Sequence, residues 1–170
     1  MMSRSYINET HRCIYMWAEQ VFEKRLAPVI AARTSLEICE LVIAYMGEHS
    51  REKKVEEIAD CAIMMWQLAF AHNIDARPVS STSFISALEE SPVGYALAIF
   101  RSFATYMERA NAKGAHDAPE HLKKALMALE ELANIEGIEL PGEVDRKMLI
   151  NRARTWEKLV SGHFQHVAVA

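Results

Sequence analysis

Apolar residues recur through most of the chain at spacings of three and four, which is the periodicity of an amphipathic helix. No segment alternates apolar and polar residues clearly enough to predict a strand. The pattern predicts helices over about residues 7–26, 28–47, 51–72, 92–112, 119–135 and 143–160. We therefore expect an all-α chain, folded as a helical bundle of about five to six helices in one domain over residues 1–170.

Turn and cap residues set the limits of these helices. Pro28 suits the first turn of the second helix, and Gly47 is placed to end it. Ser50 is a capping residue in front of the third helix. The segments DARPVSSTSF and AKGAHDAPEH are predicted loops, and GIELPG is a predicted turn. The tail HFQHVAVA predicts no particular structure.

The third and fifth predicted helices share a pattern at an offset of 64 residues, which places Leu68 on Leu132. One hypothesis is a degenerate internal repeat of two helical hairpins, over about residues 29–76 and 93–140. The acids of the first hairpin would then be lost from the second. Helical hairpins also match one another by periodicity alone, so chance similarity is the alternative.

Composition and charge narrow the functional classes. The net charge is −4, so no diffuse positive field attracts nucleic acid, and we expect no nucleic-acid partner. The longest apolar run, CAIMMW, is far too short to span a bilayer. The first residues lack the apolar stretch of a secretion signal. We therefore expect a soluble protein with no membrane partner.

The cysteines indicate a reducing compartment. Cys13, Cys39 and Cys61 are an odd number and lie in predicted helices. This distribution suits reduced, buried thiols better than a disulfide framework. We therefore expect a cytoplasmic location.

Two pairs of acids stand beside apolar helix faces. Glu37 and Glu40 are three residues apart in the stretch LEICEL, as are Glu57 and Asp60 in EEIADCAIMM. Residues three apart share one helix face, and the short connection between the two helices makes them antiparallel neighbours. The 16 residues between Glu40 and Glu57 allow one pair to face the other across the hairpin. We expect the four carboxylates to converge.

Convergent carboxylates favour a bound cation, because close like charges raise one another's pKa and discourage full ionisation. Oxygen ligands select hard ions, and Mg²⁺ commonly bridges protein carboxylates to phosphates. The pattern therefore indicates a metal site for phosphate chemistry. The alternative is a solvated acidic face, because 23 of 170 residues are acidic and pairs such as Glu136 and Glu139 arise by chance.

The spacing of these acids resembles the signature of a known family. Glu-x-x-Glu from Glu37, then 16 residues, then Glu-x-x-Asp from Glu57 is similar to the MazG-like all-α nucleoside triphosphate pyrophosphohydrolases, which are related to the dimeric dUTPases. The stretch GIELPGEVDRKMLINRARTW resembles the C-terminal helix of that family. In that helix a Lys, an Asn and an Arg recur, here as Lys147, Asn151 and Arg154.

A finer resemblance involves the opening helix. Trp17, followed by Arg33 and LEICEL, is similar to the phage-type dATP/dGTP pyrophosphohydrolase branch. The resemblance covers about residues 8–75 and 136–157. Between them, two predicted helices replace the shorter connection of compact family members.

The resemblance implies a diphosphatase that hydrolyses a nucleoside triphosphate to the monophosphate and pyrophosphate. Glu37, Glu40, Glu57 and Asp60 would hold two or three Mg²⁺ ions, for which Mn²⁺ substitutes. A metal-activated water would attack the α-phosphorus, and Glu40 is the candidate catalytic residue that orients it. The branch implies a purine dNTP such as dGTP or dATP. Housecleaning of non-canonical nucleotides is the alternative role.

The helix that carries Lys147, Asn151 and Arg154 offers candidate substrate ligands. These positions are i, i+4 and i+7, so they follow one face and together suit a polyphosphate. The alternative is surface charge with an Asn cap.

Three more residues are candidates for substrate binding. Trp17 either stacks on a base or belongs to the core, and Arg33 joins the set through the resemblance. Lys54, like its neighbour Lys53, either reaches phosphate from the hairpin or solvates the start of the third helix.

Two other functional classes are alternatives to the hydrolase. A di-iron carboxylate bundle requires Glu-x-x-His pairs, and the sequence contains none. A non-enzymatic helical module that binds a partner is the second alternative, with the acids as a charged stripe. Related enzymes are dimers or tetramers and the predicted helices have wide apolar faces, so we expect a homodimer or homotetramer.

Overall fold

The computed structural model describes residues 4–23, 26–74, 91–113, 116–158 and 164–167. Six helices make up most of this part of the chain: α1 (Arg4–Phe22), α2 (Ala27–Met46), α3 (Arg51–Ala71), α4 (Pro92–Asn111), α5 (Ala118–Ile135) and α6 (Leu140–Ala153). Two short strands follow, β1 (Thr155–Lys158) and β2 (Phe164–Val167). The predicted all-α helical bundle is confirmed. The predicted loop DARPVSSTSF lies outside the described residues.

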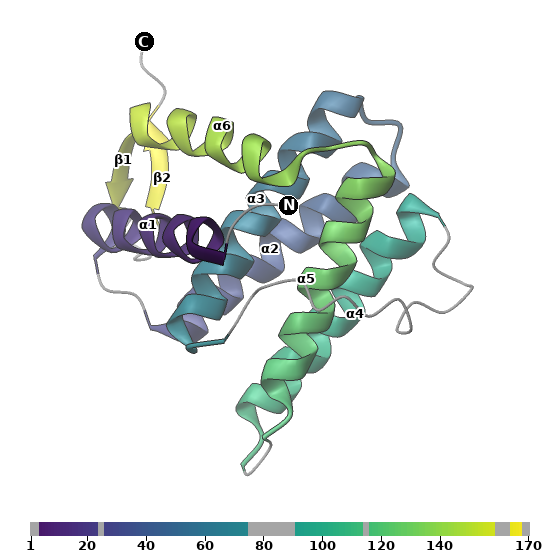
Figure 1. The fold of residues 1–170 in the computed structure, drawn as a ribbon, viewed down its shortest axis with the longest axis horizontal. Coiled ribbons are helices and arrows are strands. Elements are labelled where there is room, and N and C mark those ends of the chain that lie inside the picture. The colour runs from purple at the N-terminus through teal and green to yellow at the C-terminus, as the bar shows by residue number, and fades with distance from the viewer. Residues whose placement is uncertain (1–3, 24–25, 75–90, 114–115, 159–163, 168–170) are drawn as a thin grey trace.

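The bundle is built from two helical hairpins and two flanking helices (Figure 1). Helices α2 and α3 form the central hairpin, and α4 and α5 form the second. The hairpins pack side by side, because α2 contacts α4 and α3 contacts α5. Helices α1 and α6 pack against α3 at the end of the molecule that carries the two strands (Figure 1). Helix α3 is therefore covered from several directions, and α2 from fewer.

Short polar side chains set the helix starts that the sequence predicted. The Ser50 hydroxyl accepts a hydrogen bond from the backbone N–H of Lys53, and Ser91 accepts one from Gly94. These bonds satisfy N–H groups that a first helical turn leaves without a partner. The connection between α2 and α3 is thereby held to four residues, 47–50.

Helices α3 and α5 end in the same way, 64 residues apart. Asn73 and Gly137 both take positive φ, 55° and 66°, as is common after a helix C-terminus. The following N–H, of Ile74 or of Ile138, donates back to a carbonyl of the helix at 2.8 Å in each case. This cap is widespread in unrelated helices, so the matching ends do not test the repeat hypothesis.

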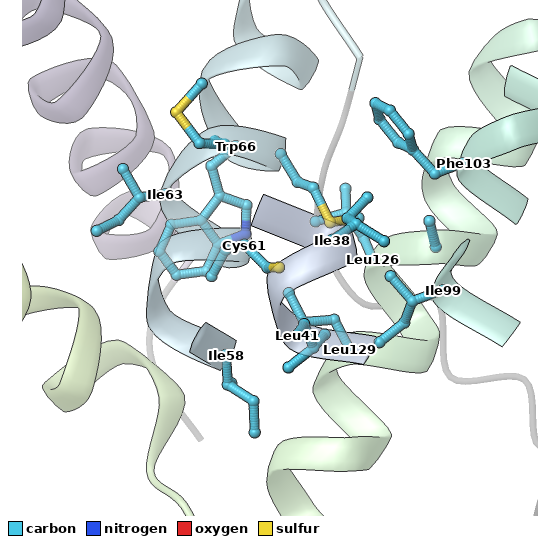
Figure 2. Packing of buried hydrophobic residues seen from close by; sticks show 14 of the residues in the cluster. Ile38, Leu41, Ile58, Cys61, Ile63, Trp66, Ile99, Phe103, Leu126 and Leu129 are labelled. Atoms are coloured by element: carbon cyan, nitrogen blue, oxygen red, sulfur yellow. The ribbon is translucent and has the colours of Figure 1, made fainter. Parts of the chain in front are cut away.

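The core lies where the two hairpins meet (Figure 2). Leu41 of α2, Ile58 of α3, Ile99 of α4 and Leu129 of α5 are all fully buried. Burial of such aliphatic side chains contributes about 1.5–3 kcal/mol each. This core fixes α2 against α3 and so determines how their acids face each other.

The thiols differ from the prediction. Cys61 is buried in the core as expected, but Cys13 and Cys39 are exposed, so the expectation of three buried thiols was wrong for these two. Cys39 is exposed because it lies on the face of α2 that is turned away from the core. All three thiols are free.

The C-terminal region also differs from the prediction. The helix expected over 143–160 begins at Leu140 and ends at Ala153, where Arg154 turns to an extended backbone. Strand β1 then pairs antiparallel with β2, with Trp156 opposite His166. Packing of the half-buried Trp156 ring against Phe22 of α1 favours the extended backbone over continued helix. The pairing was missed because four residues are too few for alternation to show.

The first helix was predicted to continue to residue 26, but α1 ends at Phe22. Glu23 follows in the left-handed region, with φ of 61°, which no right-handed helix tolerates.

Within the described residues, none of the helices combines the length and the apolar character needed to cross a bilayer.

Candidate functional site

A cavity of about 370 Å³ opens between α1, α2, α3, α6 and β1. Its volume lies within the usual range for small-molecule sites. One part of the wall is acidic, basic side chains surround that part, and the remaining wall is aromatic and aliphatic. The elements that line it come from both ends of the chain.

The acidic wall consists of residues from the central hairpin. Glu37, Glu40 and Glu57 each bring a carboxylate oxygen within 4.8 Å of the other two. Glu37 and Glu57 are 6% and 1% exposed, whereas Glu40 is exposed. The Oε2 atom of Glu57 is buried and has no hydrogen-bond partner. A buried, unpartnered carboxylate oxygen is costly, so it indicates a ligand or ion.

Asp60 lines the same cavity but lies outside this group of three. Its Oδ2 atom is 2.8 Å from the Nζ of Lys147 on α6. The same ammonium is 3.0 Å from Oε1 of Glu56. Lys147 is therefore the fixed counter-charge of two carboxylates on α3, and it is itself buried.

Burial and mutual repulsion shift the protonation of the acids. Burial raises the pKa of Glu37 to about 7, opposed by Arg33 and reinforced by the neighbouring carboxylates. Burial also raises the pKa of Glu57 and of Asp60, against the opposing effects of Lys53 and Lys147. The surrounding charges are thus not sufficient to keep the buried acids at their ordinary pKa.

Cations of the central hairpin neutralise part of the acidic wall. The Arg33 guanidinium is 2.7 Å from Oε1 of Glu37, one turn along α2. Lys53 forms an ion pair with Glu57, one turn along α3. Both cations line the cavity and are about half exposed.

Lys54 does not line the cavity, in contrast to its role in the predicted site. Its ammonium lies over the Tyr45 ring, 5.3 Å from the ring centre. A one-residue step turns a helical side chain by about 100°, so Lys53 and Lys54 face different surroundings.

Helix α6 supplies a second row of polar groups. Lys147, Asn151 and Arg154 all line the cavity. The Nη1 atom of Arg154 donates to Oδ1 of Asn151 at 3.2 Å. The main-chain carbonyl of Asn151 accepts a hydrogen bond from the Trp156 indole N–H at 3.0 Å. The end of α6 and the start of β1 are therefore joined at the cavity wall.

The remaining wall is aromatic and aliphatic. The rings of Phe22 and Trp156 meet at nearly a right angle with their centres 4.9 Å apart, and the Trp17 ring centre lies 6.4 Å from that of Trp156. Gln67 is the buried polar residue of this wall. Flat apolar rings next to a charged wall suit a ligand with an aromatic part and an anionic part.

The structure brings nine of the ten predicted site residues to this one cavity and leaves Lys54 outside. The nine are Trp17, Arg33, Glu37, Glu40, Glu57, Asp60, Lys147, Asn151 and Arg154.

Sequence reasoning missed seven residues of the wall: Phe22, Val29, Glu56, Ile63, Met64, Gln67 and Trp156. Glu56 stands four residues before Asp60, so helical spacing offered a signal. Trp156 was missed because the last helix was predicted to continue to residue 160, which placed Trp156 within a helix.

Comparisons with known proteins give no match: none among protein-family models, curated proteins or solved structures.

Proposed function

We propose that the chain is a metal-dependent nucleoside triphosphate pyrophosphohydrolase of the MazG-like kind. Its substrate would be a (deoxy)nucleoside triphosphate, with a purine dNTP such as dGTP or dATP as the first candidate. The products would be the monophosphate and pyrophosphate. The proposal depends on one observation: three carboxylates within 4.8 Å of one another, including a buried unpartnered oxygen of Glu57, line a cavity that also has an aromatic wall.

The donor set fits Mg²⁺, with Mn²⁺ as a substitute. Glu37, Glu40 and Glu57 offer only oxygen, which hard divalent ions prefer. A cation would partner the buried Oε2 of Glu57, and it would offset both the burial and the weaker repulsion between carboxylates that raise the pKa of Glu37. Asp60 would join them if Lys147 moved toward an incoming phosphate. We propose two or three ions, as the family resemblance implies.

The two kinds of wall suggest how a nucleotide would lie. Phosphates would face the acids and their metal, where Arg33, Lys53 and Arg154 supply positive charge. The base would lie against Trp17 and the rings beside it. Such a pose uses the charged and the aromatic parts of one cavity at once.

Bound Mg²⁺ would supply Lewis-acid polarisation of phosphate oxygens and activation of a water. The residues of the chain would hold the α-phosphorus in line and counter the charge that develops on the leaving pyrophosphate. Arg154 is placed for that charge because it lines the cavity at the end of α6. Glu40, the exposed acid of the three, is our candidate to orient the water.

The direct experiment is a panel of dNTPs and NTPs with Mg²⁺ or Mn²⁺, in which release of pyrophosphate is followed separately from release of orthophosphate. We expect pyrophosphate and monophosphate, with the highest kcat/KM for a purine dNTP. Orthophosphate as the first product would instead indicate a phosphatase. No turnover of any nucleotide would contradict the proposal.

Matched variants separate chemistry from folding. Glu57→Gln and Asp60→Asn should abolish turnover while circular dichroism shows the same helix content. Glu108→Gln on α4 is the control, because this exposed acid lies outside the cavity. Equal activity of all three variants would indicate that the acids are not part of the site.

The second candidate is a non-enzymatic helical module that binds a partner, with the acids as a charged stripe. It predicts that the melting temperature is indifferent to Mg²⁺ and Mn²⁺, whereas a metal site predicts a rise. A housecleaning role would appear in the panel as a preference for damaged or non-canonical nucleotides. Three free thiols and a nucleotide substrate fit the cytoplasmic location that we propose.

A further inference from the structure

Helix α2 exposes a continuous apolar stripe on the side opposite the core. Leu36, Ile43 and Met46 are 51%, 60% and 69% exposed, which is unusual for such large side chains along one helix. The stripe consists of Val29, Ala32, Leu36, Cys39, Ile43 and Met46, all exposed. The spacing alternates three and four over residues 29–46, about two and a half heptads, which is the pattern of a helix–helix seam.

Both faces of α2 are therefore apolar. Ile38 and Leu41 are buried in the core on one side, while the α2 stripe faces solvent on the other. The three charged residues of α2 are Arg33, Glu37 and Glu40, and none of them interrupts the stripe. A helix that is apolar all round is normally covered on all sides. A second protein surface with a matching apolar stripe would provide such a cover.

We propose that the α2 stripe is the interface at which two copies of this chain pair antiparallel, related by a two-fold axis that passes between the two α2 helices at the level of Glu37 and Ile38. This pairing places Leu36 against Cys39 of the second copy and Ala32 against Ile43. Each of these layers matches a larger side chain with a smaller one, as close helix packing requires. The same surface serves both copies, which is the condition for a closed dimer.

Charges beside the stripe select the antiparallel orientation. Arg33 and Glu40 follow the stripe positions Ala32 and Cys39 and so border one edge of it. In an antiparallel pair, Arg33 of each copy lies near Glu40 of the other, which gives two pairs of opposite charge. In a parallel pair, this edge of one copy would instead face the opposite edge of the stripe on the other copy. The corresponding positions on that opposite edge carry no charge.

The α2 seam also borders the candidate site. Val29, Arg33 and Glu40 belong both to the seam or its edge and to the wall of the cavity. Pairing therefore brings Arg33 of the second copy to the Glu40 side of the cavity. Each site would contain a cation from the other copy, which one chain alone does not supply.

The test measures mass in solution by sedimentation velocity, and needs no nucleotide. The full chain should sediment at twice its 19.3 kDa, and Leu36→Glu with Ile43→Glu should shift it to the monomer without loss of helix content. Leu149→Glu is the control, because Leu149 is 67% exposed on α6, outside the stripe. A monomeric wild type would overturn the proposal. A dimer that survives the α2 substitutions but is lost with Phe100→Glu on α4 would also overturn it.

Two further variants test the orientation. A short bifunctional maleimide should link two copies through Cys39, which lies near the proposed axis, and Cys39→Ser should abolish the link while Cys13→Ser does not. Arg33→Glu should weaken the dimer, and Arg33→Glu combined with Glu40→Arg should restore it. Linking that persists in Cys39→Ser, or no recovery in the double exchange, would rule out this arrangement. These results stand whether or not the protein hydrolyses nucleotides.

Discussion

Lys147 and Asp60 form a buried ion pair that joins α6 to α3, with Nζ 2.8 Å from Oδ2. The Lys147 side chain is 5% exposed and also contacts Glu56 on the neighbouring turn of α3. One ammonium thus balances two carboxylates at the edge of the cavity. Because Lys147 is committed to this contact, it cannot meet a phosphate without first releasing Asp60.

Replacement of Lys147 should destabilise the fold. Lys147→Met leaves two partly buried carboxylates without their counter-charge, at a cost of about 2 kcal/mol in the free energy of unfolding. Urea unfolding without divalent metal measures the loss. Arg146→Met is the matched control, because Arg146 is exposed and pairs with Glu143 within α6, so its loss should cost under about 0.5 kcal/mol. Equal losses in the two variants would show that burial of Lys147 contributes nothing.

Removal of one buried acid should separate stability from metal binding. Glu57→Gln eliminates a carboxylate whose pKa is raised by burial and whose Oε2 has no partner. In a chelator, we expect a melting temperature equal to or higher than that of the wild type. The rise caused by Mn²⁺ in the wild type should disappear in the variant. Differential scanning fluorimetry records both, and an unchanged Mn²⁺ effect would exclude Glu57 as a ligand.

The pKa of Glu37 predicts a dependence of stability on pH. Because it is about 7 in the folded chain against 4.5 as the ordinary value, the folded state keeps a proton that the unfolded state releases between these values. Without metal, this group therefore lowers the free energy of unfolding as pH rises from 4.5 to 7, by at most about 3 kcal/mol. The pKa of Glu56 shifts in the opposite direction and so affects stability with the opposite sign. The comparison of wild type with Glu37→Gln isolates the effect of Glu37 from that of Glu56.

We expect the Glu37→Gln variant to gain stability over the wild type progressively across that pH window in a chelator. With Mn²⁺ the sign reverses, because the ion competes with the proton on Glu37 and binds more tightly as pH rises. A stability difference that does not vary with pH would mean that the pKa of Glu37 is not raised in the folded chain.

The central hairpin was the most predictable part of the molecule. Pro28 and Ser50 mark helix starts with a known hydrogen-bonding reason, and α2 and α3 begin and end within a residue or so of the predicted limits. Once two helices and a short turn are known, helical spacing places Glu40 and Glu57 on facing sides. Local rules alone were sufficient for this step.

Contacts between distant segments were not predictable in the same way. Lys147 and Asp60 come from helices that meet at an angle set by side-chain packing, and one sequence does not specify that angle. The position of the Trp156 side chain depends on where α6 ends. The helical pattern of the sequence does not show that end, because it does not include the cost of leaving the indole exposed. The aromatic wall was therefore found only in the structure.

The aromatic wall should contribute to both folding and ligand binding. Trp156→Ala removes the contacts with Phe22 and Trp17 and the hydrogen bond to Asn151, which should cost about 2 kcal/mol in urea unfolding. Trp156→Phe keeps a ring and should cost about half as much. Calorimetry with a non-hydrolysable triphosphate should show weaker binding in the order wild type, Trp156→Phe, Trp156→Ala. Unchanged binding by Trp156→Ala would place the base elsewhere.

Lys53 and Lys54 give the sharpest comparison, because they are adjacent, chemically identical and differently placed. Lys53 lines the cavity and pairs with Glu57, whereas Lys54 lies over the Tyr45 ring. If phosphates lie against the acidic wall, Lys53→Ala should lower kcat/KM at least tenfold, or about 1.4 kcal/mol, through loss of a nearby positive charge. Lys54→Ala should stay within about twofold of the wild type, since its charge faces away from the cavity. Pyrophosphate release measured for the two variants in parallel decides between them, and a larger loss for Lys54→Ala would show that the nucleotide approaches from the Tyr45 side.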